Sequence, residues 1–303
     1  YGFCRSPIFI VGRWYMGVYA PRDRIAFAMA LMGAVIGIVA SIGGFTSGFF
    51  VEKFSFVFTF RLSAFIALSA GVLILVSGRW LNFQKHKTFE VVKETQKNPK
   101  IGKNVKVITY SLGLIGIFDY IAFGVINTYL PLFATDVIGA STSQVGIIFG
   151  IRGIFMTFMT IPISRVIDKY DRWASLPIGL LIQGIGVAGI AMSKGYLGLI
   201  LSMLVFSLGA SIYSPTVTAL LSQSVPVHWT GTAMGIFGFM EDIGWMIGPS
   251  VGGLFWVGIN QPSAFWFASF ITMLTIPLSY LAKSMVKKSL EVEKILTMPA
   301  NRA

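Results

Sequence analysis

Long apolar stretches alternate with short charged clusters along this chain of 303 residues. A helix that crosses a bilayer needs about 20 predominantly apolar residues, and each stretch reaches that length with at most one ionisable group. The stretches are residues 25–51, 54–78, 107–135, 137–164, 173–193 and 195–227. Residues 229–282 are long enough for two further spans, separated by a turn at 258–262. The pattern predicts eight complete membrane-spanning helices.

The composition agrees with this pattern. Apolar residues make up 55% of the chain and charged residues only 12%, against about 25% charged residues in a typical soluble domain. We therefore predict an all-α membrane protein. The single Cys4 and the two distant histidines, His86 and His228, give no reason to expect a metal or other cofactor. Because the chain begins with Tyr1 and residues 1–12 are too short to span a bilayer, we expect a fragment that starts inside a span.

The positive charges predict which side of the membrane each loop faces. If successive loops alternate sides, most of the 24 Lys and Arg residues fall on one side. Short cytoplasmic loops accumulate Lys and Arg, so we assign that side to the cytoplasm of a multi-pass plasma-membrane protein. The net charge of +12 then reflects topology rather than nucleic-acid binding. The predicted parts are a remnant of a first half (1–79), a cytoplasmic linker (80–105), a second half (106–284) and a cytoplasmic tail (285–303).

A single constant offset superimposes two regions of the chain without a gap. The matched pairs include Pro21 with Pro226, Gly33 with Gly238, Gly43 with Gly248 and Gly48 with Gly253. The two regions begin spans that run in the same direction, so the repeat is parallel. Parallel repeats are one of the architectures of membrane transporters.

A glycine and proline motif in the second region resembles the major facilitator superfamily. The sequence Gly244-Trp-Met-Ile-Gly248-Pro249-Ser-Val-Gly252-Gly253 is similar to the pattern G-x-x-x-G-P-x-x-G-G of that family. The resemblance implies a bundle of two pseudo-symmetric six-helix halves, here from part of span four to span twelve, and is nearest to the drug or metabolite:proton antiporters. Small residues at this spacing allow close helix packing. The predicted packing residues are Gly33, Gly43, Gly244, Gly248, Pro249, Gly252 and Gly253.

A second motif lies in the predicted loop between spans eight and nine. The sequence Ser164-Arg165-Val-Ile-Asp168-Lys169-Tyr-Asp171-Arg172 is similar to the loop motif G-x-x-x-D-R-x-G-R of the same family. The resemblance implies a conformational gating role for Asp168, Lys169 and Arg172. Ser164 and Asp171 replace glycines of the family pattern.

Ionisable groups at membrane depth are costly and mark functional sites by default. The resemblance implies that Asp119 (span seven), Arg152 (span eight) and the adjacent Glu241 and Asp242 (span eleven) face a central cavity. Residue counts from the predicted cytoplasmic ends place Asp119, Arg152 and Glu241 roughly 20 Å deep, near the middle of a core about 30 Å thick. We therefore predict one layer of charged side chains. The other candidate site residues are Asn127, Trp245, Ser211, Ser214 and Arg5.

We hypothesise that Arg152 pairs alternately with Asp119 and with a carboxylate of span eleven, for which Glu241, on the face of Trp245, is favoured. Burial favours proton binding by such a carboxylate, which would couple protonation to alternating access. A static buried salt bridge is the alternative. A stripe of polar residues on one face of span ten consists of Ser207, Ser211, Ser214 and Thr218. This stripe fits either interhelical hydrogen bonds or contact with a solute.

These observations favour a monomeric secondary active transporter that moves a small solute across the lipid bilayer, coupled to protons, with efflux favoured. Uptake of an anionic metabolite, bound by Arg152 and Arg5, is the first alternative. A sensor that has lost transport is another. An intramembrane enzyme is disfavoured because the chain offers no recognisable catalytic arrangement, and the lack of a phosphate-binding loop argues against ATP-driven pumping.

Overall fold

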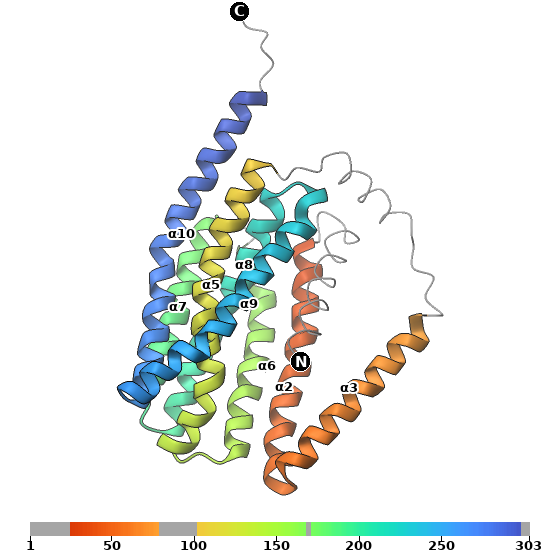
Figure 1. The fold of residues 1–303 in the computed structure, drawn as a ribbon, viewed down its shortest axis with the longest axis vertical. Helices are drawn as coiled ribbons and strands as arrows, with labels where there is room; N and C mark the ends of the chain where they lie inside the picture. The colour runs from red at the N-terminus through yellow and green to blue at the C-terminus, as the bar shows by residue number, and fades with distance from the viewer. Residues whose placement is uncertain (1–24, 79–101, 168–170, 298–303) are drawn as a thin grey trace, which may run out of the picture.

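The computed structural model describes residues 25–78, 102–167 and 171–297. Apart from short connections, these residues are helical, which confirms the predicted all-α membrane fold (Figure 1). The helices are α2 (Ile25–Lys53), α3 (Phe56–Gly78), α5 (Lys103–Leu132) with a terminal π-helical turn η1 (Phe133–Val137), α6 (Thr142–Ile167), α7 (Arg172–Met192), α8 (Tyr196–Ser224), α9 (Val227–Gly258) and α10 (Gln261–Thr297).

Seven described helices are long and apolar enough to cross a membrane, and α9 adds a helix of 32 residues that contains Glu241 and Asp242. Side-chain caps mark several of the helix starts, including those of α7 and α10. Asp171 accepts a hydrogen bond of 3.0 Å from the backbone N–H of Trp173 at the start of α7. Asn260 does the same for the N–H of Ser263 at the start of α10, also at 3.0 Å. Helix α10 continues past residue 284, so the first part of the predicted tail belongs to this helix.

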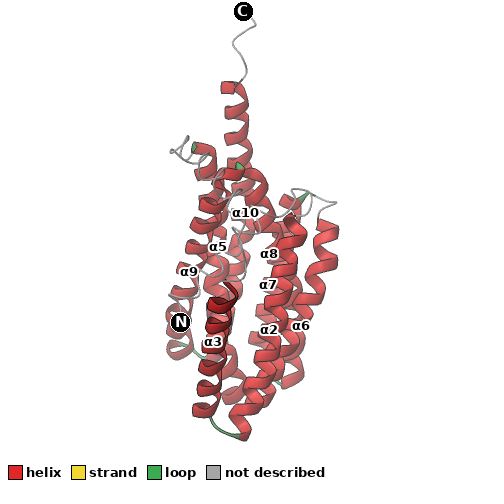
Figure 2. Ribbon diagram, turned by 90° about the vertical axis from the view of Figure 1, so that its right-hand side faces the viewer, coloured by secondary structure: helices red, strands yellow, loops and turns green. Residues whose placement is uncertain are grey.

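The helices from α5 to α10 form a bundle whose long axes run in roughly one direction (Figures 1 and 2). The most extensive contacts are those of α5 with α9, α7 with α8, and α2 with α6, and α10 packs on both α5 and α7. Helix α2 is thereby attached to the bundle through α6. Helix α3 leans away from it, and none of its candidate span is buried in the described structure.

Small residues bring α2 and α6 into close contact. Two stripes face one another: Gly37, Ser41, Gly44 and Gly48 on α2, and Gly146, Gly150, Gly153 and Thr157 on α6. A Cβ added at Gly146 would lie 2.7 Å from the carbonyl oxygen of Gly44, and one at Gly48 would lie 3.1 Å from the Cα of Gly146. Such contacts leave no room for a side chain at these positions, so glycine is required there.

On α2, the residues in close contact with α6 are not the two that were predicted. A Cβ at Gly33 or Gly43 would meet no atom within 4 Å, so neither residue makes a close packing contact in the described structure. Helix α2 is apolar on every side, and its sequence does not show which face packs against protein rather than lipid. The contacts fall instead on the stripe from Gly37 to Gly48.

The motif of α9 lies directly against α5. A Cβ at Gly244 would overlap the carbonyl oxygen of Ile117, and one at Gly248 would overlap that of Ile121. One turn further on, a Cβ at Gly252 would lie 2.9 Å from Val125, and one at Gly253 would lie 2.6 Å from the hydroxyl of Tyr129. That hydroxyl donates a hydrogen bond of 2.9 Å to the carbonyl oxygen of Pro249. These contacts fix the distance between α5 and α9, the helices that carry the acidic candidate residues.

Candidate functional site

A layer of buried polar side chains separates two apolar clusters in the bundle. On α5, Ile115 belongs to one cluster and Ala122 to the other, and Asp119 lies between them. On α7, Gln183 lies between Leu180 and Val187 in the same way. The buried polar residues at this level on the other helices are Arg152 and Thr157 on α6, Ser207 and Ser211 on α8, Glu241 on α9, and Ser269, Thr272 and Thr275 on α10. Buried polar residues thus occur on each helix from α5 to α10, and the three charged residues predicted to share a layer are all among them.

Asp119 is hydrogen-bonded to Gln183, a residue that the sequence analysis did not select. The Nε2 atom of Gln183 donates to Oδ1 of Asp119 at 2.8 Å. Only 2% of Asp119 and 1% of Gln183 is exposed. The Oε1 atom of Gln183 is also buried, and it has no hydrogen-bond partner in the described structure. Gln183 is the only amide or charged side chain in residues 173–193, and this signal could have identified it.

Glu241 lies beside Asp119 on the neighbouring helix. Its Cγ atom is 3.3 Å from the position that a Cβ would take at Gly116, one helical turn before Asp119. The two buried acidic side chains therefore lie near one another, at the contact between α5 and α9. Glu241 is buried, whereas the adjacent Asp242 is exposed. This difference agrees with the expectation that only one of the two adjacent acids faces the interior.

Arg152 is held by an amide and by aromatic rings. Its Nη1 atom donates a hydrogen bond of 3.3 Å to Oδ1 of Asn127 on α5. Its guanidinium carbon lies 4.8 Å from the ring centroid of Phe123, 5.2 Å from that of Phe206 and 6.0 Å from that of Phe149. In this state the hydrogen bonds join Arg152 to Asn127 and Asp119 to Gln183, so the predicted pairing of Arg152 with Asp119 is not the arrangement observed.

Aromatic packing connects the environments of Arg152 and Glu241. The ring of Trp245 lies 5.1 Å from that of Phe123 and 6.5 Å from that of Tyr120, centroid to centroid. Phe123 is therefore packed between Trp245 and the guanidinium of Arg152.

The two serine candidates of α8 have different surroundings. The hydroxyl of Ser211 donates to the carbonyl oxygen of Ser207 at 2.8 Å and to that of Met156 on α6 at 3.3 Å. Ser214 is exposed. Ser211 thus makes the interhelical hydrogen bond that was one of the two interpretations of this stripe.

Polar contacts join α7, α8 and α10 at one end of the bundle. Nζ of Lys283 on α10 contacts Oδ2 of Asp171 at 2.8 Å, and Arg172 donates a hydrogen bond to Gln223 on α8. The hydrogen bond from Lys283 lowers the pKa of the Asp171 carboxyl below its ordinary value, with a smaller contribution from the backbone N–H of Trp173. The gating candidates Asp168 and Lys169, and the site candidate Arg5, lie outside the described residues.

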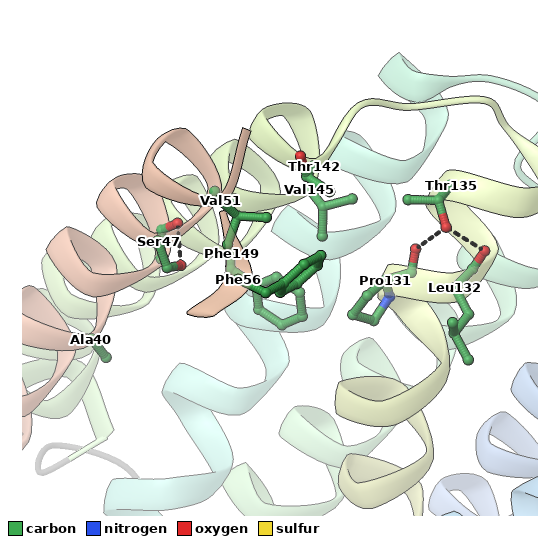
Figure 3. Close-up of a pocket in the computed structure, with 13 residues that line it drawn as sticks. Ala40, Ser47, Val51, Phe56, Pro131, Leu132, Thr135, Thr142, Val145 and Phe149 are labelled. Carbon is green, nitrogen blue, oxygen red and sulfur yellow. Dashed lines mark hydrogen bonds between the residues drawn. The ribbon is translucent and has the colours of Figure 1, made fainter. Parts of the chain in front are cut away.

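A cavity of about 620 Å³ opens at the opposite end, where α5 ends and α2 meets α3 (Figure 3). Its walls are almost entirely apolar, and its polar contributors are small hydroxyl groups such as that of Thr135. The ring of Phe149 forms part of the wall. The same residue contacts Arg152, so the cavity adjoins the polar layer.

Comparison with known proteins decides the family. The model of the Major Facilitator Superfamily matches residues 1–240 and, in a second overlapping match, residues 112–296. The chain belongs to the major facilitator superfamily. The resemblance seen in the two motifs is thereby confirmed, and the protein is a member of a family of membrane transporters.

Two relatives illustrate how far the similarity extends. An uncharacterized MFS-type transporter (MJ1560) of Methanocaldococcus jannaschii is 23% identical over 279 residues, which cover 88% of this chain and 69% of that protein. The quinolone resistance protein NorA of Staphylococcus aureus is 22% identical over 189 residues, covering 62% of this chain and 47% of NorA. The chain thus aligns with less than half of NorA.

Solved structures of the superfamily share the fold. The Escherichia coli fucose:proton symporter FucP superimposes with a TM-score of 0.64 and 14% identity, covering 90% of this chain and 72% of FucP. The human organic anion transporter MFSD10 gives a TM-score of 0.54 and 20% identity, covering 60% of this chain and 42% of MFSD10. The predicted fold class, a helical bundle of the major facilitator type, is confirmed.

Proposed function

We propose that this protein is a secondary active transporter that moves a small solute by alternating access and couples the movement to protons. The observation that carries this proposal is the pair of buried carboxylates, Asp119 and Glu241, in the polar layer. Two adjacent carboxylates removed from water repel one another, and a proton on either one relieves that repulsion. The pair is therefore suited to take up and release a proton.

Gln183 is suited to support Asp119 in both protonation states. Its amide N–H donates to the carboxylate as observed. A carboxylic acid has an O–H that must donate in turn, and the unused Oε1 of Gln183 can accept it after the amide rotates by half a turn. A buried proton site with only donors around it would oppose protonation. Gln183 removes that obstacle.

The position of the polar layer between two apolar clusters suggests how protonation could control the transport cycle. A charged carboxylate in such a layer is expensive to close off from water. We infer that closing of the bundle around the layer is easier when the pair holds a proton, and that opening to either side allows the proton to leave. The polar contacts of Asp171 with Lys283 and of Arg172 with Gln223 would stabilise one of the two arrangements at the end of the bundle where α7 begins.

Efflux is the favoured direction. NorA is named for quinolone resistance, and export of an amphipathic compound would produce such resistance. The apolar cavity beside an aromatic cluster would suit compounds of that kind. Uptake of an anionic solute remains the second candidate, favoured by the contact of Arg152 with a neutral amide rather than a carboxylate. We further propose a monomer in the plasma membrane, with the linker 80–105 and the C-terminus in the cytoplasm.

Gradient-driven transport by the full-length protein in proteoliposomes tests this proposal. We expect an imposed pH gradient to drive accumulation of at least one member of a solute panel that includes a fluoroquinolone, ethidium and benzoate. The exposed Asp136→Asn is the matched control and should retain this activity, whereas Asp119→Asn should lose it. If the pH gradient changes the accumulation of none of the transported solutes, proton coupling is contradicted. A complete lack of movement across the panel would contradict transport of these solute classes.

A further inference from the structure

Arg152 is a buried cation with most of its hydrogen-bonding capacity unused. A guanidinium has five N–H donors in a fixed planar arrangement. Among the described residues it makes one hydrogen bond, to the neutral amide of Asn127 at 3.3 Å. Only 8% of Arg152 is exposed, but its remaining donor atoms are not among the fully buried atoms that lack a partner, so a small polar group can still reach them. The rings of Phe123, Phe149 and Phe206 surround the cation, and a ring face attracts it without accepting a conventional hydrogen bond.

Among the described residues, this cation is hydrogen-bonded to a neutral amide and not to a carboxylate. Burying a guanidinium is strongly unfavourable unless it is paired and hydrogen-bonded, and arginine pairs best with a planar carboxylate through two parallel hydrogen bonds. The buried acid Asp119 is instead bonded to Gln183 from another helix. The described contacts therefore provide this site with its positive charge and its aromatic walls, but with no negative partner for Arg152.

The adjoining cavity indicates the shape and polarity of the rest of an anionic ligand that would bind Arg152. Phe149 lies between the cavity and Arg152. Its ring lines the cavity of about 620 Å³ and is also in contact with the guanidinium of Arg152. This volume lies within the range of small-molecule sites, about 300–1,000 Å³. The other lining residues from α2, α5 and α6 are mainly aliphatic or glycine. Phe149, Phe56 and Pro131 are among the residues that line this space (Figure 3), so an apolar body would fit beside the cation.

We propose that Arg152 binds the carboxylate of an organic anion whose apolar or aromatic body occupies the adjoining cavity. Binding requires Phe149 to rotate so that the cavity and the guanidinium become continuous. The Phe123 and Phe206 rings would then flank the head group of the ligand. This inference deepens the proposed transport function by naming a substrate class, and it holds for either direction of transport.

Equilibrium binding to the purified full-length protein tests the inference without any transport. The probes are 2-naphthoate, its neutral analogue 2-naphthamide, and the aliphatic anion decanoate, each measured by calorimetry at neutral pH without a pH gradient. The wild type should bind 2-naphthoate at least about tenfold more tightly than 2-naphthamide, the ratio expected for one charge-assisted pair. Arg152→Gln should abolish this preference, and the exposed Arg165→Gln on the same helix should retain it.

A second variant keeps the test valid if Arg152→Gln fails to fold. Asn127→Asp places a carboxylate where the amide now accepts from Arg152, so the cation acquires an internal partner. We expect this variant to unfold at a higher temperature than the wild type and to lose the preference for 2-naphthoate. A purely structural role for Arg152 would give the higher stability without changing anion binding.

Two results would overturn the inference. One is a wild-type protein that binds neither 2-naphthoate nor decanoate, or binds 2-naphthoate no better than the amide. The other is undiminished anion preference in Asn127→Asp or in a folded Arg152→Gln. Because no proton gradient is involved, failure of proton coupling in proteoliposomes would leave these binding results unchanged. Conversely, proton-coupled transport of a cation alone would be compatible with the proposed function and not with this inference.

Discussion

Gln183 Nε2 donates a hydrogen bond of 2.8 Å to Asp119 Oδ1, and both residues are almost completely buried. The bond joins α7 to α5 across the middle of the bundle. Its buried position makes it a determinant of stability as well as a feature of the proposed proton site. The two roles can be separated by substitution.

Gln183→Leu should destabilise the protein by about 1–3 kcal/mol, because it leaves a buried carboxyl group without its partner. Replacing both partners removes that cost, so Asp119→Leu combined with Gln183→Leu should be more stable than the sum of the single changes predicts. Thermal unfolding of the four proteins in one detergent measures this coupling. Strictly additive effects would mean that the bond contributes nothing.

Glu241→Gln should impair gradient-driven transport much more than Asp242→Asn. Glu241 is buried beside Asp119, whereas Asp242 is exposed on another face of α9. Initial rates of solute uptake at several pH values, with both variants at equal density in the liposomes, give the comparison. Equal losses would show that the buried position of Glu241 has no special importance.

Gly146→Ala and Gly43→Ala should change stability in opposite directions. A methyl group at Gly146 would lie 2.7 Å from the carbonyl oxygen of Gly44, whereas nothing lies within 4 Å at Gly43. Overpacking at the first site should cost about 1–3 kcal/mol. At the second, alanine should gain about 0.5–1 kcal/mol through its higher helix propensity. Thermal midpoints of the two variants decide the matter, and a tolerated Gly146→Ala would contradict the observed contact of α2 with α6.

Asp171→Asn should lower stability at neutral pH and have no effect in strong acid. The hydrogen bond from Lys283 lowers the pKa of Asp171 from its ordinary value of 3.8. Its stabilising contribution is therefore complete above pH 3.8 and is lost as the pH falls through the lower pKa of the folded protein. Because both side chains are about half exposed, with 55% and 44% accessible, the contribution should be only about 0.2–1 kcal/mol.

Asparagine caps a helix about as well as aspartate, so Asp171→Asn removes the charge and keeps the cap of α7. Thermal midpoints at about pH 7 and about pH 2 give the comparison, with Asp136→Asn as the exposed control. A difference between wild type and Asp171→Asn that is the same at both values would exclude the ion pair as its cause.

The sequence predicted the spans and the family, and it selected buried charged residues, for physical reasons that can be identified. Apolar length alone defines a membrane helix, and the expense of Asp119 and Arg152 at that depth marks them without structural information. The spacing of Gly244, Gly248 and Gly252 places all three on one face of α9, and that face packs against α5.

What the sequence did not predict depends on helix rotation. Gln183 is polar but uncharged, and it meets Asp119 only because α7 turns that face towards α5. An apolar helix such as α2 has no polar face to fix its rotation, so Gly43 could not be distinguished from Gly44 in advance. The choice of Asn127 as the partner of Arg152 likewise follows from side-chain geometry between two helices, which no spacing along either helix reveals.

Proton movement driven by a solute gradient tests the central claim most directly. Proteoliposomes containing the full-length protein are given a gradient of a transported solute but no pH gradient, and the internal pH is recorded. We predict that the wild type moves protons under these conditions. Asp119→Asn should still exchange labelled for unlabelled solute but should move no protons. Solute-driven proton movement that persists in both Asp119→Asn and Glu241→Gln would contradict the account.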